Sequence, residues 1–359
     1  LEGADSLDDY LDQRGRVTPY ESLLYRNLGG LYLGQERYHD AASTYHAYVE
    51  RAPLADDAPT LQVAVANAFA AGAFTDRVLE AKVEFVERFG FDGDWMAVRD
   101  GSAPDEVRDY LRSALGELAR HFHAVAQASG LPGDYTVAAE WYRRRLNGFP
   151  DDPEAAEFAF LLAEALDDGG RTLEAAAAYE QMSRTYAEDP RAPEAGYAAV
   201  LAYRSVADTD GQDVSRLAAI EAGLRFADAF PAHEHAVAVR ADAAEALFDS
   251  GDLIRAADQA DLLASMEPPI SPVHLRTALL VLGHARFDTG GYEDAENAYR
   301  RLLTVLAAGD EERAPVRERL AASIYSQGRA QAAAGATDAA VEHYLRVALE
   351  IPDSPIAAT

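Results

Sequence analysis

Apolar and polar positions recur along the chain with a helical period, and one spacing of particular residues stands out. An alanine is followed four residues later by an aromatic residue and twelve residues later by a proline, as at Ala41, Tyr45 and Pro53. The spacing returns at Ala138 and Ala340, and further copies keep two of its three elements. Because residues four apart share one face of a helix, the pattern predicts a series of helices.

A second pattern lies upstream of each anchor alanine. A small residue stands twelve positions before it, often preceded by a large apolar residue, as at Leu28 and Gly29 before Ala41. Glycine often stands five positions before the anchor, where a left-handed residue ends a helix, and the later proline ends the next one. The spacing predicts two antiparallel helices per repeat that approach closest at the small residue and the alanine, with the aromatic filling the space between neighbouring units.

These residues resemble the tetratricopeptide repeat. The family pattern W-x2-L-G-x2-Y, A-x3-F and P is matched almost position for position by Tyr25, Leu28, Gly29, Tyr32, Ala41, Tyr45 and Pro53. The resemblance covers roughly residues 20–353. It implies an all-α fold, a right-handed α-solenoid of about seven antiparallel helical hairpins forming a superhelix, in which each unit contacts only its neighbours.

The repeat register divides the chain into segments. We expect residues 1–19 to flank a cut repeat, 20–89 to hold two units, 90–105 to form an insertion, 106–353 to hold five further units, and 354–359 to begin a truncated one. The unit near 58–89 is degenerate, because Arg77 stands where the anchor alanine is expected. The segments 154–203 and 344–359 also resemble long repeat proteins of the proteobacterial cell envelope. This resemblance favours a periplasmic or envelope location over the cytoplasmic alternative.

Composition narrows the possible functions. The 359 residues include 61 acidic and 32 basic side chains, giving a formal net charge of −29, with no cysteine and Lys82 as the only lysine. Missing cysteine excludes disulfide frameworks and cysteine-ligated metal sites. The acidic balance argues against a nucleic-acid partner. Because the acids are spread along the whole chain, they favour adaptation to strong salt over a surface made for a cationic partner.

Histidine pairs are the best candidates for metal ligands. His121 and His123 would point about 200° apart on a helix, so they cannot hold one ion from one face. His233 and His235 follow a proline near a predicted helix start, where extended backbone could bring them together. Surface or capping roles are the default for all four, and we predict no metal site and no cofactor.

Three other motifs have competing interpretations. Residues 208–213 partly match a calcium loop but lack its first and last acids, so a turn with Asp213 as N-cap is the alternative. Trp95, beside the acidic turn 92–94, either packs the insertion onto the repeats or stands exposed as a partner anchor. The run 143–145 of three arginines is expected to be a solvated helix face.

The family resemblance also implies a binding surface, because first-helix side chains line the concave face of such repeats. Carried onto this chain, the partner-binding groove comprises Phe160, Glu164, Asp168, Glu245, Phe248, Asp249, His284, Phe287, Asp288 and Tyr325. Acids interleaved with aromatics suit an extended peptide with basic and apolar side chains. The alternative is that the aromatics only close gaps between units.

The function predicted from these features is a non-catalytic protein–protein interaction scaffold that binds an extended peptide or a partner helix. It would belong to a larger envelope or assembly protein, could self-associate through exposed end units, and contains no run long enough to span a membrane. No nucleotide-binding or hydrolase fingerprint occurs, and we predict no catalytic residue. The alternatives are a helical-repeat enzyme or enzyme subunit acting on cell-wall or polysaccharide material, expected to show two converging carboxylates of raised pKa in a deep pocket, or a metal- or ligand-responsive module.

Overall fold

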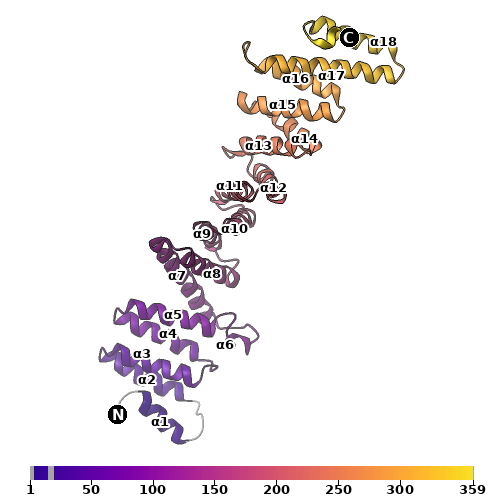
Figure 1. The fold of residues 1–359 in the computed structure, drawn as a ribbon. Helices are drawn as coiled ribbons and strands as arrows, with labels where there is room; N and C mark the ends of the chain where they lie inside the picture. Colours follow the sequence, from indigo (N-terminus) through magenta and orange to yellow (C-terminus); the bar gives the residue numbers. More distant parts are fainter. Residues whose placement is uncertain (1–3, 15–19, 359) are drawn as a thin grey trace. The chain divides into compact units, whose positions relative to one another are not determined.

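The computed structural model describes residues 4–14 and 20–358, and the regular elements within these ranges are all helices (Figure 1). The chain forms two compact units, Leu1–Ala178 and Tyr179–Thr359, and the division falls within one helix. Each unit is built from consecutive antiparallel helices joined by short turns, which is the all-α hairpin arrangement predicted from the repeat.

The first unit begins with a short helix and continues in hairpins. Its helices are α1 (Ala4–Arg14), α2 (Glu21–Gly34), α3 (Tyr38–Arg51), α4 (Ala58–Ala71), α5 (Thr75–Phe89), α6 (Asp94–Ala97), α7 (Asp105–Ser129), α8 (Pro132–Gly148), α9 (Ala155–Asp168) and the first part of α10 (Thr172–Thr185). Successive helices from α2 to α5 pack on one another, as do those from α7 to α9. The α5 helix packs against α7, and the short α6 between them in the chain also contacts α5.

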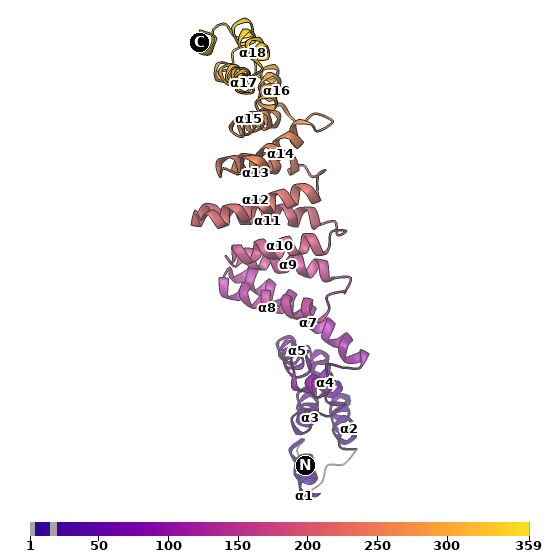
Figure 2. The same cartoon turned by 90° about the vertical axis from the view of Figure 1, so that its right-hand side faces the viewer.

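The second unit continues the same scheme. After the end of α10 come α11 (Ala192–Asp210), α12 (Asp213–Ala229), α13 (Ala236–Asp249), α14 (Leu253–Ala264), α15 (Pro272–Asp288), α16 (Tyr292–Val305), α17 (Arg313–Ala333), α18 (Thr337–Glu350) and the 3₁₀ helix η1 (Pro355–Ala358). Neighbouring helices from α11 to α18 pack in chain order, and the first helices α13 and α15 also touch directly (Figure 2).

The repeat residues have the packing roles that their spacing indicates. The anchor alanines are buried in each repeat that carries the pattern. The small residue twelve positions earlier makes room for the aromatic ring of its own hairpin: a Cβ added to Gly283 would lie 2.5 Å from Cε1 of Tyr299. The aromatic therefore packs inside its own unit as well as against the next, where the ring of Tyr142 lies 6.0 Å from that of Phe158.

The number of hairpins and the register of the second one differ from expectation. Eight helix pairs, from α2/α3 to α17/α18, lie within the described ranges, against about seven expected. A residue with positive φ stands five positions before the anchor in several repeats, as at Gly251 before Ala256. In the degenerate unit Ala73 has this conformation, with φ 58°. The anchor there is therefore Val78, and the assignment of Arg77, which is exposed, was wrong.

The insertion folds back onto the first unit through its tryptophan. Trp95 is 1% exposed, and its indole Nε1 donates a hydrogen bond of 2.8 Å to the carbonyl oxygen of Ala55. Its ring meets that of Phe89 edge to face, and the guanidinium of Arg99 lies 4.0 Å from its ring centroid. Trp95 thus anchors the insertion to the turn after α3, and the alternative of an exposed partner anchor was wrong.

Candidate functional site

The groove residues predicted in the first unit lie on α9. Phe160, Glu164 and Asp168 are four residues apart and so share one face of the helix. Phe160 and Glu164 are half-buried and Asp168 is exposed. Burial raises the pKa of Glu164, and the negative charge of Asp168 raises it further. Burial and the same neighbour also raise the pKa of Asp167.

A buried histidine lies close to this acidic face. His123 on α7 has its Nδ1 2.9 Å from the hydroxyl of Tyr142, while its Nε2 finds no hydrogen-bond partner among the described residues. Burial lowers the pKa of His123, and the nearby Asp168 carboxylate opposes that shift. Because its ring is buried against the aromatic of its own hairpin, His123 is a packing residue of the repeat.

In the second unit the predicted groove begins on α13. Burial raises the pKa of Glu245, and the negative charges of Asp242 and Asp249 add to the shift. Phe248 is half-buried and packs against the core between α13, α14 and α15. Its ring lies 6.0 Å from that of His284 on α15, so the packing of α13 on α15 brings these two predicted residues together.

The remaining predicted residues lie on α15 and α17. The ring of His284 also lies 5.8 Å from that of Tyr299, and burial lowers its pKa. Phe287 meets Tyr292 edge to face at 5.4 Å, and Tyr325 lies 5.2 Å from Tyr344. These aromatics are half-buried and pack against the core of the unit, so each one closes a gap whether or not it also meets a partner.

Ion pairs in both units preferentially join successive second helices. Arg144 on α8 reaches Glu87 on α5 at 2.5 Å, and Arg255 on α14 reaches Glu221 on α12 at 2.7 Å. The acids of the predicted groove do not take part in these ion pairs between second helices. Within residues 4–14 and 20–358 no ion pair is made by Glu164, Asp168, Glu245, Asp249 or Asp288.

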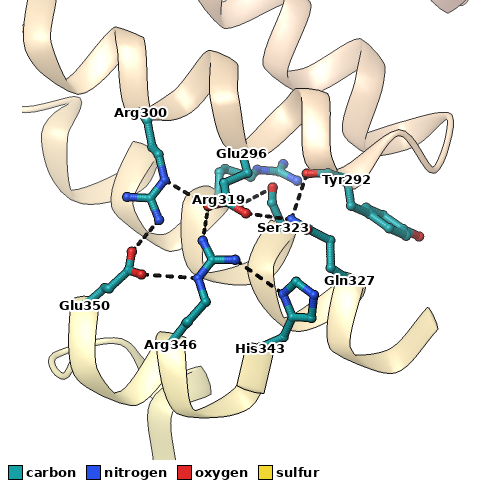
Figure 3. A network of polar contacts seen from close by, with 9 residues as sticks. All are labelled: Tyr292, Glu296, Arg300, Arg319, Ser323, Gln327, His343, Arg346 and Glu350. Carbon is teal, nitrogen blue, oxygen red and sulfur yellow. Dashed lines mark hydrogen bonds and ion pairs between the residues drawn. The ribbon is translucent and has the colours of Figure 1, made fainter. Parts of the chain in front are cut away.

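Unlike the acids of the predicted groove, a buried glutamate near the end of the second unit is surrounded by cationic and amide partners. Glu296 on α16 is 6% exposed and accepts hydrogen bonds from Arg300 at 2.9 Å and Gln327 at 2.7 Å, and another from Arg346 (Figure 3). Both arginines also bind Glu350, so the network joins α16, α17 and α18. All of its charges are compensated, which marks it as structural. Sequence reasoning did not find it, because residues that bond to one another in it are up to fifty positions apart.

A cavity of about 790 Å³ lies between α11, α12 and α13. It is lined by Arg204, Ala207, Asp208, Asp213, Arg216, Leu217, Ala219, Ile220, Asp242, Ala243, Ala246, Asp249 and Ser250. Only Asp249 among these was predicted to bind a partner. The available signal was the spacing of 44 positions between the anchor alanines Ala175 and Ala219, which includes the 19-residue helix α11.

The structure offers one cluster of possible metal ligands among the described residues. Ligand atoms of His46, Glu50 and Glu84 all lie within 4.8 Å of one another, with His46 Nε2 2.8 Å from Glu84 Oε1. The guanidinium of Arg88 pairs with both carboxylates and lies 2.9 Å from Glu84. Arg88 therefore already supplies the positive charge that a cation would bring.

The histidine pairs singled out from the sequence have structural roles. His233 Nδ1 accepts a hydrogen bond of 3.2 Å from the backbone N–H of His235, just before α13. The ring of His235 stacks on Tyr197 at 4.2 Å. His121 lies edge to face with Phe122. The His233 bond matches the default expectation of surface or capping roles, whereas the ring contacts of His235 and His121 are packing contacts, which that expectation did not include.

The partial calcium loop is a helix-to-helix turn in which two of the acids, Asp210 and Asp213, already have partners. Asp210 accepts hydrogen bonds from the backbone N–H of Gln212 at 2.8 Å and the hydroxyl of Ser215 at 2.7 Å. Gly211 has the left-handed conformation that ends α11. The residue at the N-cap of α12 is Gln212, so the expectation of Asp213 there was wrong.

The arginine run is only partly a solvated face. Arg143 pairs with Glu174 in solvent, and Arg144 is also exposed. Arg145 is completely buried, with its guanidinium 5.0 Å from the ring centroid of Phe149 and paired to Asp152 at 3.1 Å. The solvated-face interpretation was wrong for Arg145, which helps to fix the first helix of the next repeat.

Comparisons with known proteins give structural similarity without a sequence relative. No family model matches the chain, and no curated protein matches it. A solved tetratricopeptide repeat protein from Parabacteroides merdae is 10% identical, aligns over 84% of this chain and 98% of its own, and has a TM-score of 0.27. The P58(IPK) TPR domain is 15% identical, aligns over 94% of this chain and 95% of its own, and has a TM-score of 0.25. A human IFIT1 dimer with PPP-AAAA is 15% identical, aligns over 96% of this chain and 93% of its own, and has a TM-score of 0.27.

The geometry of this chain decides the fold. Consecutive antiparallel helix pairs, buried anchor alanines and a small residue beneath the aromatic of the same pair are all present. The chain has a tetratricopeptide-repeat-like fold. In this fold the predicted groove residues belong to the first helices of their pairs, on α9, α13, α15 and α17. None of the described helices is both long and apolar enough to cross a membrane.

Proposed function

We propose that the chain is a non-catalytic interaction scaffold whose first-helix acids and aromatics bind an extended peptide or a partner helix bearing basic and apolar side chains. It acts within a larger protein of the cell envelope or of an assembly. The repeat fold supports the general role, because stacked helix pairs present long surfaces to other proteins. The basic, apolar partner is inferred from the chemistry of the predicted groove.

The observation that carries the proposal is that these acids have no cationic partner in the part of the chain that the structure describes. Arginines compensate acids along the second helices. By contrast, burial raises the pKa of Glu164 and Glu245, and neighbouring carboxylates raise it further. A raised carboxylate pKa means that the ionised form is destabilised where it stands. Arginine or lysine side chains of a partner would relieve this repulsion, and complementary charge also steers association.

The half-buried aromatics supply the second part of the surface. Phe248 and His284 lie together on adjacent first helices. In the sequence Phe248 directly precedes Asp249 and stands three positions after Glu245. A partner's aliphatic groups can pack on these rings while its cations meet the acids. Such a combination of apolar anchors and charge is typical of extended-peptide recognition.

Peptide selection on the complete chain tests the proposal. A random peptide library displayed on phage should yield binders that combine arginine or lysine with aliphatic or aromatic residues. Binding of a selected peptide should weaken about three- to tenfold in Glu164→Gln or Glu245→Gln, because each loses a charge at the surface. Glu293→Gln, which removes an equal charge from an exposed position on the second helix α16, is the matched control.

Stability separates a binding role from a folding defect. Because the pKa of Glu245 is raised, Glu245→Gln should leave the protein at least as stable as before while it weakens binding. Peptides without basic residues, or affinities that fall equally in Glu245→Gln and Glu293→Gln, would rule out the proposed surface.

A further inference from the structure

The cavity between α11, α12 and α13 combines an apolar floor with charged walls. Ala219, Ile220 and Ala243 are buried at its base. Leu217 lines it as well and is 50% exposed, so part of the apolar surface is open to solvent. An aliphatic side chain that covered this surface would remove apolar area from water on both partners. At about 790 Å³ the cavity has room for several side chains of a bound segment.

The charged side chains that line the cavity include more acids than bases. The lining holds four aspartates, Asp208, Asp213, Asp242 and Asp249, against two arginines, Arg204 and Arg216. Arg204 pairs with Asp242 at 2.9 Å across α11 and α13, and Arg216 pairs with Asp213 at 2.9 Å within α12. Asp208 on α11 and Asp249 on α13 take part in no ion pair within the described ranges.

We infer that this cavity is a specific binding pocket for a peptide segment that carries an arginine or lysine next to an aliphatic side chain. The inference rests on the proposed function and gives it a location. The partner's cation binds Asp208 and Asp249, which come from two helices, and its aliphatic group covers Leu217 and Ile220. The existing Arg204–Asp242 pair stays intact at the wall.

Charge complementarity selects this occupant over others. Four aspartates oppose the entry of a phosphate or of an acidic peptide. Arg204 and Arg216 oppose a compact polycation, which would place several positive charges beside them. A segment with one cation beside an apolar group meets both unpaired aspartates and the alanine, leucine and isoleucine surface.

The absence of cysteine from the chain makes a site-specific reporter simple to install. Ser250 lines the cavity, and its hydroxyl donates to the carbonyl of Leu247 at the end of α13. Ser265 makes the same bond to Leu262 at the end of α14 and is not among the residues that line the cavity. Ser250→Cys and Ser265→Cys, each labelled with an environment-sensitive fluorophore on the full chain, form a matched pair.

The probe is a short synthetic peptide of repeated Ala-Leu-Arg triplets. We expect it to shift the emission of the label at position 250 and to leave the label at 265 unchanged. The same peptide with citrulline in place of arginine should bind at least tenfold more weakly, because the side chain keeps its shape and loses its charge. If the peptide binds and the emission of the label at position 250 does not change, the inference is overturned.

Charge variants locate the contact. Asp208→Asn with Asp249→Asn should raise the Kd of the arginine peptide about tenfold. Asp261→Asn with Glu293→Gln removes two exposed acids outside the cavity and should change the Kd less than twofold. Equal weakening by both pairs, or spermine binding as tightly as the peptide, overturns the inference.

The outcomes also separate this pocket from the broader proposal. If the peptide binds and Glu164→Gln or Glu245→Gln weakens it while the cavity pair does not, the pocket is refuted and the scaffold proposal stands. If the arginine and citrulline peptides behave alike, and no selected peptide is basic, both fail.

Discussion

Gly29 lies directly against the ring of Tyr45, so that a Cβ at Gly29 would overlap the ring, whereas the space beside the next residue, Gly30, is open. The two glycines are neighbours in α2 with opposite surroundings, one buried and one exposed. The same contact recurs at Gly328, where a Cβ would lie 2.7 Å from Cε1 of Tyr344. The small residue of the repeat is therefore required by the aromatic sixteen positions later.

Gly29→Ala and Gly30→Ala should change stability in opposite directions. In an exposed helix interior alanine is favoured over glycine by about 1 kcal/mol, so Gly30→Ala should stabilise the protein by roughly that amount. At Gly29 the methyl group must displace the Tyr45 ring, and overpacking of this kind costs about 1–3 kcal/mol. Urea denaturation of both variants measures the difference. Equal stabilisation by both would contradict the packing role of Gly29.

The hairpins could be predicted because their signals are local and repeated. The anchor alanine, the small residue and the aromatic of one repeat lie within sixteen positions, and their contacts are set by helix periodicity. The register failed at Arg77 because an alanine, not a glycine, takes the left-handed turn conformation at residue 73. Nothing in the sequence marks an alanine for that conformation.

The missed features depend on contacts between repeats. Arg145 looked solvated beside two other arginines, but its aromatic neighbour Phe158 and its partner Asp152 are supplied by the residues that follow its helix. The cavity between α11, α12 and α13 is lined by residues of three successive helices, up to 46 positions apart in the sequence. The groove residues, by contrast, came from family positions, and their binding role stays a prediction.

Removing the carboxylate partner of Arg145 should be costly. Burial alone would raise the pKa of Asp152, but a backbone N–H bond and the Arg145 guanidinium outweigh it and hold that pKa below its ordinary value. Asp152→Ala removes the nearer counter-charge of a buried guanidinium and leaves only Glu154, 3.9 Å away, so we expect a loss of about 3 kcal/mol. A double variant with Arg145→Met should recover much of the loss, which a urea double-mutant cycle would show.

Arg144→Lys is the control for that cycle. The side chain of Arg144 is 44% exposed, so its exchange for lysine should change stability by less than about 0.5 kcal/mol. Arg145→Lys should cost clearly more, because lysine cannot stack its charge flat against Phe149 and Phe158. Similar effects of the two exchanges would show that the Arg145 site tolerates any cation.

Glu296 should make stability fall in acid. Burial alone would raise its pKa, but hydrogen bonds from Gln327, Arg300 and Arg346 outweigh burial and hold the pKa below the ordinary value. A carboxyl whose pKa is lower in the folded state contributes stability above its unfolded pKa of about 4.3, and this contribution is lost as the pH falls through the folded value. Glu296→Gln should destabilise the protein by about 2 kcal/mol at neutral pH, because the two arginines lose their buried partner.

The dependence of stability on pH separates the contribution of Glu296 from that of other carboxyl groups. Denaturation midpoints measured from pH 7 down to pH 3 should fall more steeply for the wild type than for Glu296→Gln. Glu293→Gln, on the exposed side of the same helix, should follow the wild-type curve. Parallel curves for wild type and Glu296→Gln would mean that the network in Figure 3 does not hold the carboxylate ionised.

Ala73→Gly should stabilise the first unit. Ala73 has φ 58°, and the left-handed conformation costs a non-glycine residue about 1–2 kcal/mol. Part of the gain is offset because glycine loses more backbone freedom on folding, so we expect a net increase of about 1 kcal/mol in unfolding free energy. The reverse exchange, Gly251→Ala at φ 85°, should lose a similar amount. Destabilisation by Ala73→Gly would refute the register that places the anchor at Val78.

Glu245→Gln should raise stability near pH 7, and the gain should disappear in acid. Its pKa is raised by burial and by Asp242 and Asp249, so the ionised carboxylate costs stability once the pH exceeds its unfolded pKa. Below that pKa the carboxyl is protonated in the folded and unfolded states, and the glutamine variant has no advantage. Because the side chain is exposed, the gain should be only about 0.5 kcal/mol, and added salt should shrink it. A gain that persists at pH 3 would point to packing, and a gain that molar salt leaves unchanged would point to burial of the carboxylate alone. Either result would remove the charge repulsion on which the proposed basic partner depends.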